Sequence, residues 1–515
     1  MNPNQILLWT VCLSCISLLV QMVRLGRQSG WGWIAGTILV VTLALAYFAP
    51  TWSSLVGGSL WAILLVIPLC GLNRLNTLVS QQRYRHAREL AQWLQLLHPM
   101  DGLPEYPKLL EALEMGQNGD FERATKILSR YHNSPTPLGR TAVVLLYRMA
   151  GRWQDLLLWI EENCPPEILQ TDVELMFFYL RALGETGDLN GLLQGLTSFE
   201  QLVGRTGDRQ SLALARMMVF AFCGDPAQVK LMFEHQLANY SASFQSFWLA
   251  TAESACGDLL RARETFADLC NSGDASLCNA AKWRLSRSQV EPHAILTASS
   301  MQILERLGRE VHQENMYGKP SRRVSQKAYG TFLLIGINLV VFAIELFAGG
   351  SEDIEVLYRL GALVPTVILQ GEWWRLLSAT FLHFGYLHLA LNMLGLYYLG
   401  IFVELKLGIW RYLATYLFCG VGSMLVVTIL AIAQNVTGQI TVGASGAIMG
   451  MVGVTGAILF QAWRREKSRF AAQRLRTIIA IVCLQMFFDL TTPNVSAIGH
   501  TSGLTLGFLI GMFLA

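Results

Sequence analysis

The stretch TVGASGAIMG, residues 441–450, places one serine among glycines and alanines inside a segment apolar enough to lie in a membrane. A second apolar stretch, SAIGHTSGLTLGFLIG at 496–511, holds a single histidine and a glycine at every fourth position. Small residues at this spacing let membrane helices approach backbone to backbone. The sequence therefore predicts two neighbouring helices, with Ser445 and His500 at matching depth.

The composition of the whole chain is that of a membrane protein. Of its 515 residues, 53% are hydrophobic and 15% are charged, and the mean hydropathy is +0.39. Such a chain is too apolar for an ordinary soluble protein and too long for a single domain. The formal net charge is only +3, and no basic block is interleaved with aromatic residues, which argues against a nucleic-acid partner.

Nine apolar runs each approach the roughly 20 residues that cross a bilayer. They lie at about 6–23, 32–49, 53–72, 330–348, 377–400, 412–433, 442–462, 476–491 and 497–515. Lysine and arginine gather in alternate loops, so the positive-inside rule places the N-terminus outside and the C-terminus in the cytoplasm. The first run lacks a basic start, and we expect it to be retained rather than cleaved as a signal peptide.

The polar region between the third and fourth runs has the pattern of amphipathic helices. A glycine followed by a polar residue recurs there at intervals of 32 to 37 residues, at Gly119, Gly151, Gly187, Gly224 and Gly257. Near-constant spacing of this kind is typical of stacked helical hairpins, and two of these segments resemble degenerate tetratricopeptide repeats. We expect a cytoplasmic α-solenoid that binds a protein partner, with mere structural support as the alternative.

The sequence thus predicts an all-α, polytopic membrane protein in four parts. These are three membrane helices at 1–73, the repeat domain at 74–314, a linker at 315–328 and a six-helix membrane domain at 329–515. The ten cysteines are scattered apart from Cys12 and Cys15, which lie in an apolar run. We therefore expect free, packed thiols rather than a disulfide framework.

Ser445 and His500 are the candidate nucleophile and general base. An imidazole within hydrogen-bond reach of a hydroxyl takes its proton as the oxygen attacks a carbonyl and returns it to the leaving amine. Asp489 lies eleven residues before His500 on the preceding span, so no third acidic member is evident and the sequence predicts a dyad. The residues expected to pack the helices and shape the site are Gly443, Gly446, Met449, Gly503 and Gly507.

His388 and Asn392 are the candidate donors to the oxyanion that forms in acyl transfer. They lie four residues apart in FLHFGYLHLALNMLG, residues 381–395, and therefore project from one helical face. His383 lies nearer the outer loop, where we expect it to orient the structure.

Each of these residues also has an interpretation without catalysis. A serine in a membrane helix often bonds only its own backbone. His388 with Asn392 would also serve as interhelical hydrogen-bonding residues or as half of a metal site. A metal is disfavoured because no carboxylate or thiolate is expected at the same depth, and no cofactor is predicted. Four polar groups at one depth among glycine-rich helices favour catalysis.

From about Tyr329 to the C-terminus, the chain resembles the rhomboid family of intramembrane serine proteases. The family motifs arrive in order: Trp374-Arg375 at the WR position, His388 and Asn392 at the HxxxN oxyanion positions, Glu404 before the cytoplasmic turn, Ser445 as the nucleophile of GxSG, and His500 as the base, followed by Gly503 and Gly507. Met449 departs from the family, which often has an aromatic residue there for the catalytic imidazole to pack on. A thioether also packs on a ring.

The resemblance implies cleavage of transmembrane-helix substrates near their outer ends, without metal or nucleotide, after the substrate helix unwinds locally. The repeat domain would recruit or regulate. Two alternatives stay open: a proteolytically silent, rhomboid-like membrane chaperone or scaffold that binds client helices, and a nine-span transporter, which would require internal symmetry that this arrangement lacks. The sequons at Asn435 and Asn494 lie in short outer loops, and we expect neither to be glycosylated.

Overall fold

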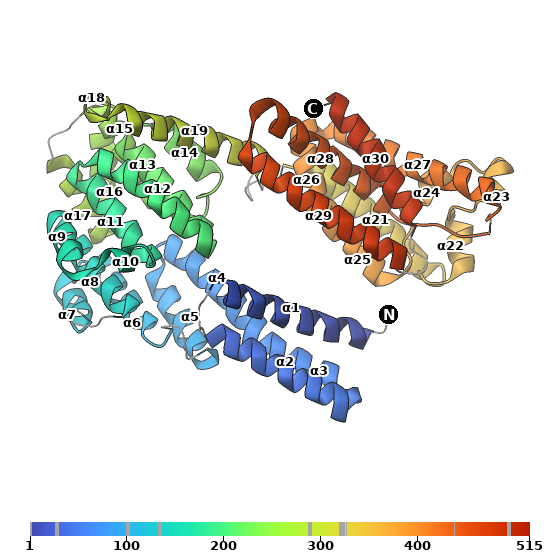
Figure 1. Ribbon diagram of the computed structural model, residues 1–515, viewed down its shortest axis with the longest axis horizontal. Coiled ribbons are helices and arrows are strands. Elements are labelled where there is room, and N and C mark those ends of the chain that lie inside the picture. Colours follow the sequence, from blue (N-terminus) through green and yellow to red (C-terminus); the bar gives the residue numbers. More distant parts are fainter. Residues whose placement is uncertain are drawn as a thin grey trace. The chain divides into compact units, whose positions relative to one another are not determined.

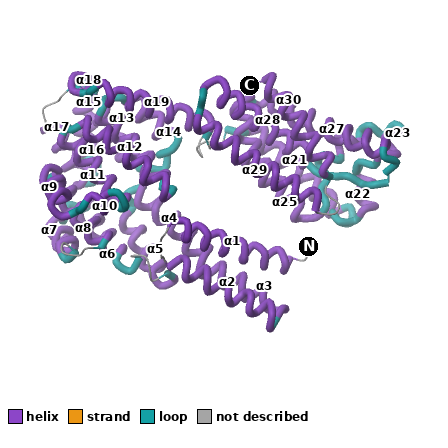
Figure 2. Tube along the Cα trace, viewed as in Figure 1, coloured by secondary structure: helices purple, strands orange, loops and turns teal. Residues whose placement is uncertain are grey.

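Helices make up the fold in the computed structural model (Figures 1 and 2), as the sequence predicts. The structure describes residues 3–25, 30–98, 103–131, 136–286, 291–318, 325, 327–436, 438–491 and 496–514. Part of the predicted linker at 315–328 and the sequon residue Asn494 lie outside these residues. The helices gather into two compact units, residues Met1–Gly308 and Arg309–Ala515.

The first unit begins with apolar helices. They are α1 (Pro3–Leu25), α2 (Gly30–Phe48) and α3 (Pro50–Trp61), which continues through a π-helical turn, η1 (Ala62–Val66), into α4 (Ile67–Ser80). Pro50 suits the start of α3, because the first helical turn needs no N–H from it. The helices pack around Val11, Cys15, Ala35, Ile38 and Leu65. Cys12 and Cys15 are both buried free thiols, which agrees with the predicted packing role.

Eight helices within the described residues are long and apolar enough to cross a membrane. The chain is therefore a multi-pass membrane protein. The first of the nine predicted spans falls short, because the apolar stretch of α1 is limited to Leu7–Val23. The third predicted span is longer than expected, because α3, η1 and α4 form one continuous helix of 31 residues, Pro50–Ser80.

The polar region of the first unit folds into pairs of helices joined by short turns. The helices are α5 (Tyr84–Leu97), α6 (Tyr106–Gln117), α7 (Phe121–Ser129), α8 (Pro137–Met149), α9 (Trp153–Asn163), α10 (Pro166–Leu169), α11 (Val173–Thr186), α12 (Leu189–Thr206), α13 (Arg209–Phe222), α14 (Pro226–Glu234), α15 (Ala242–Ala255), α16 (Leu259–Cys270), α17 (Ala275–Ser286), α18 (Pro292–Ile295) and α19 (Ala298–Tyr317). Most pack on their neighbours in the chain, as stacked hairpins do. The α-solenoid and its likeness to tetratricopeptide repeats stay predictions.

The recurring glycines sit at the turns between paired helices. All five have φ between +65° and +95°, a conformation that glycine adopts at little cost. An aspartate follows four of them and caps the next helix: Asp188, for example, accepts a hydrogen bond from the N–H of Gly191 at 2.8 Å. A glycine that ends one helix and an aspartate that starts the next therefore explain the repeating pattern in the sequence.

A cavity of about 420 Å³ lies within the hairpin region. Its wall includes Arg181, whose guanidinium lies 5.0 Å from the ring centroid of Trp153 and 5.2 Å from that of Trp248. Asp274, just before α17, also lines the cavity and accepts a hydrogen bond at 3.0 Å from Gln117 at the end of α6. Helices α6 and α17, far apart in the sequence, are thereby joined at this wall.

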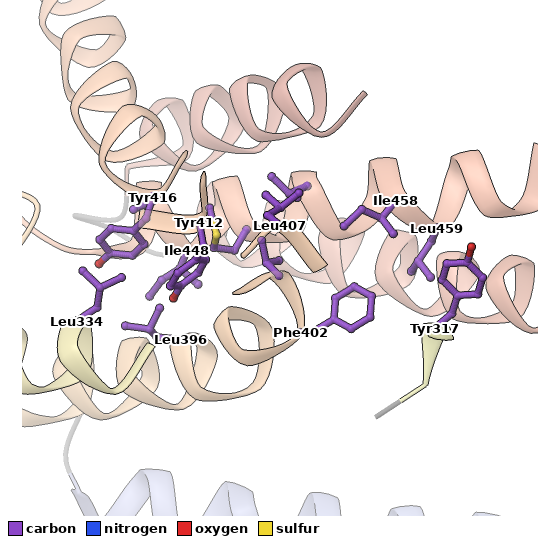
Figure 3. Close-up of a cluster of buried hydrophobic side chains, with 14 of the residues drawn as sticks. Tyr317, Leu334, Leu396, Phe402, Leu407, Tyr412, Tyr416, Ile448, Ile458 and Leu459 are labelled. Carbon is purple, nitrogen blue, oxygen red and sulfur yellow. The ribbon is translucent and has the colours of Figure 1, made fainter. Parts of the chain in front are cut away.

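The second unit surrounds one central helix, α28. Its helices are α21 (Tyr329–Phe347), α22 (Ile354–Leu360), α23 (Pro365–Leu369), α24 (Arg375–Ser378), α25 (Gly385–Gly395), η2 (Leu396–Gly400), α26 (Ile401–Leu407), α27 (Ile409–Ala433), α28 (Ser445–Glu466), α29 (Arg469–Thr491) and α30 (Ala497–Leu514). The apolar window of α28 is 89% buried, against at most 39% for the other candidate spans. Figure 3 shows the apolar core around it, to which α21, η2, α26, α27 and α28 contribute Leu334, Leu396, Phe402, Tyr412, Tyr416, Ile448 and Ile458.

The span predicted at 377–400 begins later than expected, at Gly385. The reason is Arg375, which is buried and donates hydrogen bonds to the carbonyl oxygens of Tyr358 at 2.7 Å and Ala362 at 3.1 Å. These bonds tie the start of the segment before Gly385 to the end of α22 and to the loop that follows α22, and the segment forms the short helix α24 and an irregular entry to α25. Hydropathy alone does not distinguish such a partly buried apolar segment from a membrane helix.

A buried carboxylate fixes the start of α21. Glu404 of α26 accepts hydrogen bonds from the N–H groups of Gly330 at 2.8 Å and Thr331 at 2.7 Å, and from the Thr331 hydroxyl at 2.8 Å. The first N–H groups of a helix have no partner within it, and a negative charge is favourable there. Glu404 thereby joins the first and second helices of this bundle.

Candidate active site

Backbone contact joins α28 and α30, the two helices that carry the predicted nucleophile and base. A Cβ added at Gly503 would overlap the carbonyl oxygen of Gly446, and one added at Gly507 would overlap that of Gly450. Any side chain at these two positions would force the helices apart, because the obstacle is backbone. The glycine repeat therefore acts as the sequence predicts, by letting two membrane helices touch along their length.

Ser445 is the first residue of α28 and is half-buried. The segment before it is held in place, because Leu363 and Thr441 form an antiparallel bridge and the Gly443 N–H donates to the Ala379 carbonyl at 2.9 Å. The N-cap residue is Ala444, and no side chain caps the helix. The first N–H groups of α28 therefore lie next to Ser445 without a capping side chain.

Gly443 makes room for an imidazole beside the serine. Its φ is +131°, and a Cβ built there would lie 2.9 Å from Nε2 of His388 and 3.5 Å from Oγ of Ser445. A larger residue at 443 would be both strained and in contact with the ring. His388 and Ser445, which the sequence predicts to share one site, are thus brought to the same side of Gly443.

His500 lies in the first turn of α30 and is buried. Its helix is in register with α28 at this level: a Cβ added at Gly446, next to Ser445, would lie 3.6 Å from the carbonyl oxygen of Gly499, next to His500. Within the described residues, the structure records no hydrogen bond between Ser445 Oγ and the His500 ring. The two predicted catalytic residues therefore lie on adjoining helix ends without a direct bond.

The His500 ring bonds an acidic residue, Asp489, which the sequence does not predict as a member of the site. Nδ1 of His500 lies 2.7 Å from Oδ2 of Asp489, and the Asp489 side chain is fully buried. The expectations of no third acidic member, and of no carboxylate at this depth, are therefore wrong. They fail because α29 ends and α30 begins close together in space, so that eleven residues of chain return Asp489 to the histidine.

Gln485 completes this polar group on α29. Its Nε2 donates a hydrogen bond to Oδ1 of Asp489 at 2.7 Å, so both carboxylate oxygens are engaged. Gln485 and Asp489 are four residues apart and share one face of an otherwise apolar helix. Two polar residues at that spacing inside a membrane span were the available signal, because polar groups there are costly unless they find partners.

His388 and Asn392 lie one turn apart on α25, as predicted. Nδ1 of His388 accepts a hydrogen bond from the N–H of Phe384 at 3.3 Å, which assigns the proton of the neutral ring to Nε2, the nitrogen that lies by Gly443. Asn392 is buried, and its Nδ2 has no hydrogen-bond partner within the described part of the chain. An unpaired buried donor costs about 1–3 kcal/mol and calls for a functional explanation.

His383 and Met449 are also buried. The ring of His383 lies 5.2 Å from that of His388, and the backbone N–H of His383 donates to Oε1 of Glu345 at 2.9 Å. Burial lowers the pKa of His383 to about 4, so the ring is neutral at physiological pH, in keeping with an orienting role.

Met449 follows Ser445 by one turn of α28, and its packing against the His500 imidazole stays a prediction. Among the described residues, no three metal-ligating side chains are grouped as a metal site requires.

Comparison with known proteins places this geometry in a recognised domain. Residues 370–515 match the family model described as the Rhomboid domain. A 178-residue segment is 35% identical to Rhomboid protease GluP of Bacillus subtilis (strain 168) and covers 35% of this chain and 33% of that protein. A 187-residue segment is 32% identical to Rhomboid-like protease 2 of Toxoplasma gondii and covers 35% of this chain and 62% of that protein.

A plant protein gives a similar match. A 164-residue segment is 34% identical to RHOMBOID-like protein 5 of Arabidopsis thaliana and covers 32% of this chain and 51% of the relative. The chain spans less than two thirds of the length of each of these three relatives. The C-terminal part of the chain is therefore a Rhomboid domain, as the motifs from Trp374 to Gly507 suggest, and the family model covers none of the first unit.

Proposed function

We propose that this protein is an intramembrane serine endopeptidase. The observation that carries the proposal is the setting of His500. This residue lies on α30, which is in backbone contact with α28, the helix that begins at Ser445, and its Nδ1 is engaged by Asp489 of α29. An imidazole held in this way presents Nε2 as a base. The Rhomboid domain and the protease relatives support an intramembrane protease type of function.

Peptide cleavage by these residues proceeds in two steps. Ser445 Oγ bonds to the substrate carbonyl carbon as its proton passes to His500 Nε2, and the same proton goes to the leaving amine as the C–N bond breaks. Water then attacks the acyl-serine ester, and its proton returns through Nε2 to Oγ as the C–O bond breaks. His388 Nε2 and Asn392 Nδ2 donate to the negative oxygen, and losing one such donor typically costs about 10²- to 10³-fold in rate.

The proposed substrates are transmembrane helices, cut near their outer ends. A helix in a membrane hides its peptide bonds within its own hydrogen bonds, so the substrate has to unwind locally before the serine reaches a carbonyl. In the proposed orientation the N-terminus is outside, and the hairpin region and the C-terminus are cytoplasmic. The hairpin region then recruits or regulates, with a cytoplasmic protein as its partner.

Labelling with a fluorophosphonate tests the proposed nucleophile. These reagents react with serines that an adjacent base activates, so full-length wild-type protein in detergent is expected to be labelled and Ser445→Ala to fall to background. Ser502→Ala is the matched control, because the Ser502 hydroxyl of α30 bonds the Ile498 carbonyl of its own helix at 2.7 Å. In-gel fluorescence, normalised to protein, gives the readout.

The control variant is expected to label like wild type. Equal labelling of wild type and Ser445→Ala would remove the assignment of Ser445. Complete absence of labelling in a folded wild-type protein would instead favour the alternative function, a proteolytically silent membrane scaffold that binds client helices.

A further inference from the structure

We infer that Asp489 is a positioning residue for the base, so that the site works as a Ser445–His500–Asp489 triad. The inference rests on the proposed function and adds to it a carboxylate that the dyad lacks. Its geometry is a 2.7 Å contact between His500 Nδ1 and Asp489 Oδ2, with the Asp489 side chain fully buried.

The carboxylate decides which nitrogen of His500 is the base. A neutral imidazole carries one N–H, and a carboxylate only accepts hydrogen bonds, so the proton stays on Nδ1 and the lone pair of Nε2 is left for the serine. When Nε2 takes the serine proton, the ring becomes positive beside a fixed negative charge. Asp489 therefore acts on the reaction through His500 and does not touch the substrate.

Gln485 fixes the carboxylate in turn. It donates to Oδ1 of Asp489 at 2.7 Å, and the two residues belong to the same face of α29. A buried carboxylate in an apolar bundle is costly unless hydrogen bonds compensate it. Together the two bonds hold both oxygens, which orients the imidazole from the side opposite to the reaction.

A purely structural role would also use this contact, because a hydrogen bond between α29 and α30 helps to hold the bundle together. The two roles differ in what they predict for turnover. A residue that only holds the helices together affects the stability of the fold and, through it, the fraction of active protein. A positioning residue changes kcat in molecules that are folded and bind substrate normally.

Asp489→Asn separates these roles. The asparagine keeps the shape of the side chain, but its amide group can donate to Nδ1 and thereby favour the wrong tautomer, a change that lowers kcat about 10⁴-fold in a soluble triad. We expect kcat to fall by about 10²-fold or more, with KM and the thermal midpoint close to wild type. Cleavage of a transmembrane-helix substrate by reconstituted full-length protein measures kcat and KM, and scanning fluorimetry measures the midpoint.

Gln485→Met keeps the test decisive if Asp489→Asn fails to fold. This variant retains the carboxylate and an apolar side chain of similar length, and we expect a smaller loss of kcat at constant KM. If Asp489→Asn folds and its kcat equals that of wild type, the triad is overturned. If Asp489→Asn does not fold, a wild-type kcat in Gln485→Met overturns the triad instead. If the wild-type protein itself cleaved no substrate, the proposed function would be removed. Failure of the proposed function is therefore distinguishable from failure of the triad.

A second, independent observation concerns Cys270 and Cys278. Cys270 ends α16 and Cys278 lies in the first turn of α17, and their sulfur atoms are 2.6 Å apart. Both thiols are free and partly exposed. A disulfide bond requires about 2.05 Å between the sulfurs, so the pair needs a shift of only about half an ångström to close.

We propose that this pair is a site of reversible oxidation by hydrogen peroxide. One thiol is oxidised to a sulfenic acid as the peroxide O–O bond breaks and one water leaves. The second thiol then attacks that sulfur and releases a second water, so the two thiols lose two electrons and two protons in all. The new bond fixes the turn before α17, next to Asp274, which lines the cavity and accepts the hydrogen bond from Gln117.

Peptide mass spectrometry tests the site directly. Both cysteines lie on one tryptic peptide, residues 264–282, so oxidation by hydrogen peroxide followed by alkylation is expected to give this peptide two hydrogens lighter and without alkyl groups. Cleavage before Asp274 then leaves its two halves joined until a reductant is added. Cys270→Ser is expected to abolish the joined species.

Cys256 serves as an internal reference because it is an exposed free thiol on the same unit. A peptide 264–282 that stays fully alkylated at a peroxide concentration sufficient to oxidise Cys256 would overturn the proposal. So would a disulfide that joins either cysteine mainly to another position.

Discussion

Ser445→Ala, His500→Ala and the double variant are expected to cleave a transmembrane-helix substrate at one shared residual rate, about 10³- to 10⁶-fold below wild type. A nucleophile and its base act as a unit, so once one of them is removed, removing the other does not lower the cleavage rate further. The rate that is left reflects substrate binding and the remaining oxyanion donors. Single-turnover cleavage in proteoliposomes measures it.

The control for this series is substrate binding by the same variants. Neither side chain is proposed to hold the substrate helix, so the dissociation constant and the thermal midpoint should stay near their wild-type values. If the two losses multiplied in the double variant, Ser445 and His500 would act independently and the shared mechanism would be excluded. Cleavage by Ser445→Ala at the wild-type rate would exclude this serine altogether.

Gly507→Ala is expected to have the largest effect on stability of any single methyl group added to the bundle. Its Cβ would overlap the carbonyl oxygen of Gly450, a backbone atom in the second turn of α28 that cannot move aside. Overpacking of this kind costs about 1–3 kcal/mol or more. For a unit of this size, that corresponds to a fall of roughly 2–12 °C in the thermal midpoint.

Gly336→Ala is the matched control, because it adds the same methyl group to α21 with nothing within 4 Å of the new Cβ. We expect its midpoint to equal that of wild type or to lie slightly above it, since alanine favours a helix more than glycine does. Scanning fluorimetry of both variants in the same detergent gives the comparison. A stable Gly507→Ala variant with wild-type cleavage would show that α28 and α30 are less tightly joined than the structure indicates.

Much of the fold follows from local patterns. The recurring glycine and aspartate predict the hairpin turns because one residue ends a helix and the other starts the next, and both effects act within a few residues. The glycine repeat of α30 predicts its contact with α28 because only small residues permit it. By contrast, the late start of α25 depends on the bonds of Arg375 to the end of α22 and the loop that follows it, which no local pattern reveals.

In the candidate site, too, some residues can be predicted from local sequence patterns and others cannot. Ser445, His500, His388 and Asn392 can be selected from the sequence because polar residues are rare in apolar helices and these four share one depth. The role of Asp489 depends on how α29 returns to α30, and the tautomer of His388 depends on the backbone N–H of Phe384. The first is a contact between two helices, and the second depends on the backbone conformation at the start of α25. Sequence spacing alone gives no distance for either.

The start of α28 lacks a capping side chain, which lowers the stability of the helix but leaves its first amide hydrogens available. A capping serine or aspartate would stabilise a helix by about 0.5–2 kcal/mol, and Ala444 supplies no such bond. In the proposed mechanism the tetrahedral intermediate is bound to Ser445, at the helix end where these amide hydrogens and the helix dipole favour negative charge. A side chain that satisfied them at rest would compete with that intermediate for the same donors. In the proposed mechanism, the resting protein is thus slightly less stable at the helix end where the short-lived anion forms.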